Sequence, residues 1–141
     1  MPFKFEGLEV YQLALAVIDD VYALSEALPK SEEFNLKSQV RRAATSIALN
    51  IAEGSVGQTD QEQACFVGLA LRSGMEVVAC LDIIRRRAYS LDTTPISKLY
   101  RQLEILTAKL HTFRQSLDPQ QRWARETVDQ PYGSSADDNP K

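Results

Sequence analysis

Residues 94–117, TPISKLYRQLEILTAKLHTFRQSL, carry the pattern that decides the fold. Their apolar side chains recur at alternating spacings of three and four residues, the heptad of a helix that packs along other helices. Thr94 and Pro95 fit an N-cap followed by proline at the first helical position, and Pro119 ends the pattern. We therefore expect a helix over 95–117. Its repeating apolar positions are Ile96, Leu99, Leu103, Leu106, Leu110, Phe113 and Leu117.

Three further amphipathic segments precede this helix. Residues 5–28 carry two apolar stripes about 120° apart on one helix, and a proline follows them. A second helix is expected over 36–54, with Gly54 as its C-cap. A third is expected over 60–89, after a capping box that starts at Thr59. Because no segment alternates as strands do, the pattern predicts an all-α, antiparallel up-down four-helix bundle.

Length and composition fit one small domain. The chain has 141 residues, and its six glycines and six prolines are too few for a turn-rich β sandwich or barrel. The bundle is expected over residues 1–117, and residues 118–141 read as a mobile polar tail. A net charge of −3 and a pI near 5.2 disfavour a protein built mainly to hold nucleic acid.

The sequence predicts a cytoplasmic protein with no membrane span. Its N-terminus lacks the basic and apolar regions of a signal peptide, and no run of about 18 apolar residues occurs. Cys65 and Cys80 fall in one predicted helix, about 22 Å apart, which is too far for a disulfide. Both are therefore expected to be reduced and buried.

No familiar catalytic or metal-binding motif is present. The one histidine, His111, has Ala108 three residues before it, so the Glu-x-x-His pairs of di-iron bundles are missing. Neither a nucleophile elbow nor a phosphate-binding loop occurs. Gly68 and Gly74 lie inside the third predicted helix and indicate close helix packing. We expect no catalytic residue, no metal and no cofactor, and hence a protein that is not an enzyme.

A polar layer is predicted between the second and third helices. Glu76 has apolar neighbours at helical spacing, and an unpaired carboxylate there would be costly. Arg41 or Arg42 is its expected partner. A ligand pocket or a reactive acid is the alternative to a structural layer. The layer comprises Arg41, Arg42, Ser46, Asn50, Glu53, Ser73 and Glu76.

The two apolar stripes of the first helix predict an oligomer. One stripe can close the bundle, and the other would be exposed in a single chain, which a stable soluble monomer rarely tolerates. We therefore expect the second stripe to be buried between subunits. A two-fold pair would cover it as well as a ring would. The expected interface residues are Val10, Val17, Val21 and Leu24.

One basic cluster is a possible nucleic-acid contact. Three consecutive arginines end the third predicted helix, and two more basic residues follow across the turn. The alternative is an ordinary solvated helix end, where positive charge suits the helix dipole. Repetition around a ring would strengthen a weak patch. The cluster comprises Arg85, Arg86, Arg87, Lys98 and Arg101.

The most specific segment is QVRRAATSIALNIAEGS, residues 39–55. Matching positions elsewhere are Phe3, Phe5, Leu8, Val10, Tyr11, Gln12, Ala14, Phe34, Phe66, Val67, Leu69, Ala70, Ser73, Gly74 and Glu76. Together they resemble a four-helix-bundle family called 23S rRNA-intervening-sequence proteins. The resemblance covers about residues 3–113.

The resemblance implies an up-down bundle that assembles into a homopentameric ring. The family name records where some of the genes lie and not an activity. A related, strongly basic branch serves as accessory protein of retroelement reverse transcriptases. Our first hypothesis is a non-enzymatic, ring-forming interaction protein. The alternative is an RNA- or DNA-binding accessory protein that acts with a ribosomal-RNA or reverse-transcriptase partner, which the acidic pI disfavours.

Overall fold

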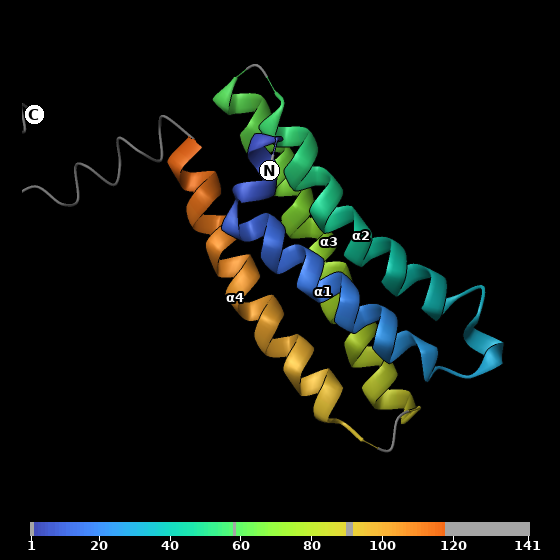
Figure 1. The fold of residues 1–141 in the computed structure, drawn as a ribbon. Helices are drawn as coiled ribbons and strands as arrows, with labels where there is room; N and C mark the ends of the chain where they lie inside the picture. The colour runs from blue at the N-terminus through green and yellow to red at the C-terminus, as the bar shows by residue number, and fades with distance from the viewer. Residues whose placement is uncertain (1, 58, 90–91, 118–141) are drawn as a thin grey trace, which may run out of the picture.

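Four long helices make up most of the described chain. The computed structural model describes residues 2–57, 59–89 and 92–117. Neighbouring helices run up and down (Figure 1), and no strand occurs within these ranges. The predicted all-α antiparallel four-helix bundle is confirmed, whereas the predicted tail, 118–141, lies outside the described residues. The elements are η1 (Lys4–Gly7), α1 (Glu9–Glu26), η2 (Lys30–Glu32), α2 (Leu36–Ser55), α3 (Asp60–Arg87) and α4 (Thr94–Leu117).

The helix ends differ slightly from the predicted ones. The first helix was expected from residue 5, but the 3₁₀ turn η1 is followed by an extended residue, Leu8, so α1 begins at Glu9. At the other end of the bundle, α3 ends at Arg87 because Ala88 adopts the left-handed conformation, with φ of 55°. The predicted cap of α3 is confirmed: Thr59 Oγ1 accepts a hydrogen bond from the Glu62 N–H at 3.0 Å.

Gly54 is not the C-cap that the sequence predicts. It lies inside α2, which continues to Ser55. A Cβ at Gly54 would lie 2.8 Å from the Phe66 Cβ, closer than such atoms approach. The glycine therefore lets α2 and α3 pack closely. At Gly74, in contrast, a Cβ would lie 3.4 Å from Thr107 Cγ2, an ordinary van der Waals contact.

Each helix packs against two neighbours around one core. Helix α1 contacts α2 and α4, and α3 contacts the same two helices from the opposite side. Phe5 and Tyr11 meet edge to face where η1 joins α1, with ring centroids 5.0 Å apart. Side chains from all four helices meet in one apolar cluster.

The predicted oligomer interface on α1 is wrong. Its four residues are buried inside the chain, in the core between α2 and α4. Most of the second stripe of α1 is half-buried and packs at the edges of this core, while its last residue, Tyr22, is 43% exposed. A helix with two neighbours can bury more than one stripe within its own chain, and the prediction did not allow for this. The corrected residues are Val10, Val17, Val21 and Leu24.

Helix α3 is long and apolar enough, by length and composition alone, to span a membrane. The core helix of a soluble protein passes the same test. Side chains such as Val77, Leu81 and Ile84 are buried among the other helices. This packing is that of the core helix of a soluble bundle.

Candidate functional site

Three residues of the predicted polar layer meet between α2 and α3. Ser73 Oγ donates a hydrogen bond to Ser46 Oγ at 2.9 Å. Asn50 Nδ2 donates to the same Ser46 Oγ at 3.0 Å and to the Ser46 carbonyl at 2.9 Å. We call these three residues the serine bridge. Because it joins side chains on two helices, the bridge fixes the register of α2 against α3.

Arg41 points away from this bridge, toward α1. Its Nε donates to Ser25 Oγ at 2.7 Å, and its Nη2 donates to a carboxylate oxygen of Glu26. The guanidinium also lies 4.4 Å from the centre of the Tyr22 ring. The expected pairing of Arg41 with Glu76 is therefore wrong. Arg41 joins α2 to α1.

The partners of Arg41 form a small ionic cluster. Ser25 is fully buried, and its hydroxyl donates to the Tyr22 carbonyl at 3.0 Å while it accepts from Arg41. The hydrogen bond from Arg41 lowers the pKa of the Glu26 carboxyl, and the charge of Lys37 lowers it further. The sequence analysis missed Ser25. Ser25 and Arg41 are 16 residues apart and on different helices, so helical periodicity does not relate them.

The remaining residues of the predicted layer do not join it. Arg42 is exposed and donates to Ser38 Oγ at 3.0 Å, and Glu53 and Glu76 are exposed too. Neither carboxylate is in an ion pair within the described ranges. Because Glu76 lies on the outer side of α3, water hydrates it and no buried partner is needed. Burial raises the pKa of the nearby Cys80 thiol, and the negative charge of Glu76 raises it further.

A shallow hollow of about 510 Å³ lies over α2, and we call it the α2 hollow. Leu49 lines it and is 58% exposed, so an apolar side chain faces water among polar neighbours. Such an open hollow suits contact with another macromolecule better than enclosure of a small ligand. Its lining residues are Tyr22, Arg41, Arg42, Thr45, Ser46, Leu49, Asn50, Ala52 and Glu53.

Tyrosine rings hold two residues of the predicted basic cluster. The guanidinium of Arg85 lies 4.9 Å from the centre of the Tyr100 ring. Arg87 Nε donates to the Tyr89 hydroxyl at 3.2 Å, and that hydroxyl donates to Glu32 at 2.8 Å. The hydrogen bond from Tyr89 lowers the pKa of the Glu32 carboxyl. Both arginines are exposed, and each lies against a tyrosine ring.

The other three residues of the cluster are on the surface. Lys98 Nζ lies 3.4 Å from a carboxylate oxygen of Asp20, which offsets its charge. Arg86 and Arg101 are exposed, and neither is in an ion pair in the described part of the chain. The positive charge at this end is thus partly neutralised, and Arg85, Arg86 and Arg101 have no acidic partner among the described residues.

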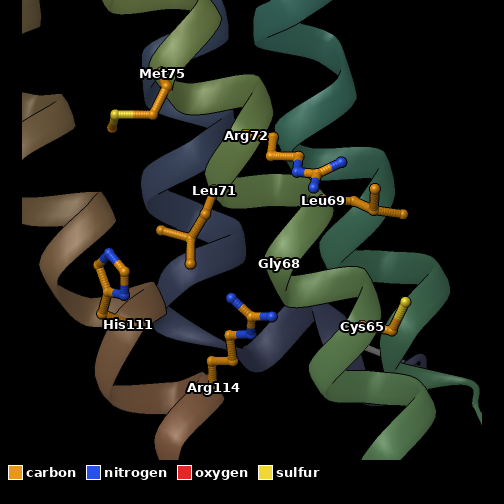
Figure 2. Close-up of a pocket in the computed structure, with 8 residues that line it drawn as sticks. All are labelled: Cys65, Gly68, Leu69, Leu71, Arg72, Met75, His111 and Arg114. Carbon is orange, nitrogen blue, oxygen red and sulfur yellow. The ribbon is translucent and has the colours of Figure 1, made fainter.

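A second hollow, of about 390 Å³, lies along α3 and α4, and we call it the α3–α4 groove. Figure 2 shows the Arg114 side chain reaching from α4 to α3 at Gly68. A Cβ at Gly68 would lie 3.1 Å from Arg114 Cζ, so the glycine makes room for the guanidinium. The groove is lined by Cys65, Gly68, Leu69, Leu71, Arg72, Met75, His111 and Arg114.

The groove corrects one prediction and agrees with another. Cys65 was expected to be buried, but it is exposed, because it lies on the outer side of α3; Cys80 is buried. His111, expected to be a surface or packing residue, is exposed. Both thiols are free. Within the described residues, no group of three His, Cys, Asp or Glu side chains is placed to hold a metal ion.

Comparison with known families decides the relationship. The model of the family described as 23S rRNA-intervening sequence protein matches residues 6–112, about three quarters of the chain. The chain belongs to this family. No curated protein matches it at a significant level.

The family match covers most of the features described above. It includes α1, α2, α3 and α4 as far as residue 112, and therefore the serine bridge, the α2 hollow and the basic cluster. Arg114, which closes one end of the α3–α4 groove, lies beyond it. Within this member of the 23S rRNA-intervening sequence proteins, the segment at residues 39–55 supplies Ser46, Asn50 and Gly54, all at the contact of α2 with α3.

Proposed function

We propose that this chain is a non-enzymatic, ring-forming interaction protein that assembles with copies of itself in the cytoplasm. One observation carries the proposal. Apolar side chains on the outward sides of α2 and α3 face water, although the bundle has a complete core without them. Leu49 is 58% exposed, Leu69 39% and Ile83 48%.

The exposed residues of α3 share one side of the helix. Leu69, Glu76 and Ile83 are seven residues apart, so they form a stripe that is close to parallel to the helix axis. Single exposed leucines are ordinary on a protein surface, whereas apolar side chains aligned on one side of a helix are candidates for an interface, here with the carboxylate of Glu76 between them. The serine bridge holds this stripe beside Leu49 of α2. We therefore move the proposed interface from α1 to the outer side of α2 and α3.

The number of subunits follows from the family resemblance. A ring requires each chain to present two different surfaces that contact head to tail, and five-fold closure is what the resemblance implies. An interface of ordinary size buries about 800 Å² on each partner. The outer sides of two helices that are 20 and 28 residues long offer room for this area.

Light scattering after gel filtration tests the assembly. Five chains of 15.8 kDa give a ring of about 79 kDa. A peak at the mass of one chain would reject the oligomer, and a peak at twice that mass would reject the ring alone.

A matched pair of variants tests the interface itself. Ile83→Asp on α3 should lower the mass to that of one chain, while Ile105→Asp on α4 should leave it unchanged. The two isoleucines are 48% and 46% exposed, so each aspartate would be tolerated equally well by the fold. Dissociation of both variants, or of neither, would contradict the proposed interface.

A second candidate function is binding of RNA or DNA beside a ribosomal-RNA or reverse-transcriptase partner. It is supported by Arg86 and Arg101, which lie at one end of the bundle without acidic partners in the described ranges. A ring would repeat this pair around its axis and raise the avidity. If the cluster binds phosphates, Arg86→Ala should weaken binding of structured RNA uniformly and flatten its salt dependence by about one phosphate contact. Undetectable binding at about 50 mM salt would reject this candidate.

A further inference from the structure

The α3–α4 groove has a basic rim around an apolar floor. Leu71 and Met75 provide apolar surface, and Arg72 and Arg114 provide positive charge. No aspartate or glutamate is among the residues that line it. Neither arginine is in an ion pair within the described ranges. The groove therefore suits an occupant that carries both a large apolar side chain and a carboxylate.

We propose that the chain's own segment 118–129 docks in this groove. In this proposal Trp123 supplies the large apolar side chain for the floor, and Glu126 supplies the carboxylate for the arginine rim. The groove shares Leu69 with the proposed interface on the outer side of α2 and α3, whereas Met75, His111 and Arg114 lie outside that interface, so the tests below change Arg114 and not Leu69.

Chain connectivity allows this docking. Helix α4 ends at Leu117, one turn after Arg114 and two turns after His111. Six residues separate Leu117 from Trp123, and an extended chain of that length spans up to about 20 Å. Helix α3 rises only about 10 Å between Gly68, which lies against Arg114, and Met75. Trp123 can therefore reach the whole floor of the groove.

The chemistry of the segment complements the groove. Trp123 is the single tryptophan of the chain, and an indole packs well against a methionine sulfur and against a guanidinium. Glu126 follows three residues later and supplies the carboxylate. Residues 118–129 contain three acidic and two basic side chains, so the carboxylate of Glu126, rather than the net charge of the segment, is what complements the groove.

Arg114 is already placed to receive this segment. Its guanidinium lies over Gly68, where any larger residue would displace it. The guanidinium is exposed and is in no ion pair within the described ranges, so it is open to a carboxylate. A segment tethered next to the groove has an effective concentration in the millimolar range, which a free partner would have to exceed. These two factors favour the chain's own segment as the occupant.

Tryptophan fluorescence of the full chain tests the docking. Because Trp123 is the single tryptophan, its emission reports on this contact alone. We expect blue-shifted emission that acrylamide quenches poorly. Arg114→Glu should shift the emission to that of the denatured chain. The control Arg101→Glu makes the same change of charge on the same helix, outside the groove, and should leave the emission unchanged. Wild-type emission equal to that of the denatured chain would overturn the proposal.

Alkylation of Cys65 by neutral iodoacetamide is a second, independent measurement. Cys65 lines the groove and Cys80 is buried, so one thiol reacts in the folded protein. If chains with the segment docked outnumber undocked chains about tenfold, Cys65 is protected most of the time. Trp123→Ser should then speed alkylation of Cys65 about tenfold. Tyr132→Ser, farther along the same segment, should have no effect. Equal alkylation rates in wild type and Trp123→Ser would overturn the docking. If Cys65 of the wild type reacts faster when the protein is diluted, the occupant is a second copy of the chain and not the chain's own segment.

Discussion

Helices α1 and α3 are both apolar around most of their circumference, and the bundle covers the two in different ways. On α1, one stripe is buried in the core and the other is mostly half-buried at its edges. On α3, Leu69 and Ile83 stay exposed although α3 contacts as many neighbours. The difference is one of direction. The second stripe of α1 faces sideways toward α2 and α4, whereas the surplus of α3 faces straight out of the bundle.

Apolar surplus on a helix is therefore evidence for a partner only when its direction is known. Periodicity measures how wide an apolar arc is, and the fold decides which part of the arc points outward. For this chain, the outward arc is on α3 and on the adjoining side of α2. Substitutions on α1 and α3 should therefore differ in the size and in the kind of their effects.

The largest effect is expected in the core stripe of α1. Val21→Asp places a carboxylate where no cation or water is available, because Val21 is fully buried. Such a change costs about 4 kcal/mol or more and should unfold most of the protein. Thermal unfolding followed by circular dichroism measures it. Leu69→Asp on α3, in contrast, changes an exposed side chain. The Leu69→Asp and Ile83→Asp proteins, both dissociated into single subunits, should melt within a few degrees of each other.

The next largest effect is expected where α3 is held against α2. Gly54→Ala adds a Cβ that would lie 2.8 Å from the Phe66 Cβ, and neither atom belongs to a flexible side-chain end. Overpacking of this kind costs about 1–3 kcal/mol, and the gain in helix propensity offsets about 1 kcal/mol of it. Urea unfolding should show a net loss of stability. Gly7→Ala is the control, because nothing lies within 4 Å of its Cβ position. A Gly54→Ala protein as stable as the Gly7→Ala protein would contradict the close approach of the two helices.

A smaller effect is expected from the serine bridge. Ser73→Ala removes the hydrogen bond to Ser46 and leaves Asn50 bonded to it, so the free energy of unfolding should fall by about 1 kcal/mol. Ser97→Ala is a suitable control, since Ser97 is exposed on α4. If the two variants unfold at the same urea concentration, the bridge contributes nothing to the packing of α3 on α2.

The sequence predicted the helices well and the surface poorly, for physical reasons. The heptad of α4 and the cap at Thr59 are local signals, and the structure agrees with both. The facing of Glu76 and of the Val21 stripe depends on how helices rotate against each other, which no local pattern encodes. Glu76 had two expected partners on the second helix, Arg41 and Arg42. Only the packing of α2 on α1 selects Ser25 and Glu26 over Glu76 as the partners of Arg41.

The smallest effect is expected from a contact that joins the end of α3 to the chain after α1. Tyr89, just after α3, donates a hydrogen bond to Glu32 in η2, and this bond lowers the pKa of the Glu32 carboxyl. A carboxyl whose pKa is lower in the folded state contributes stability that is present above its unfolded pKa and is lost as the pH falls through its folded pKa. The loss should therefore begin below about pH 4.3, the ordinary pKa of glutamate. Glu32→Gln should unfold at a lower urea concentration than the wild type at pH 7, and the gap should close between pH 4.3 and more acidic conditions. Glu104→Gln, at an exposed position of α4, should show no such convergence. A constant gap between wild type and Glu32→Gln across this range would mean that Tyr89 does not hold the ionised form of Glu32, and that the ends of α1 and α3 are joined by packing alone.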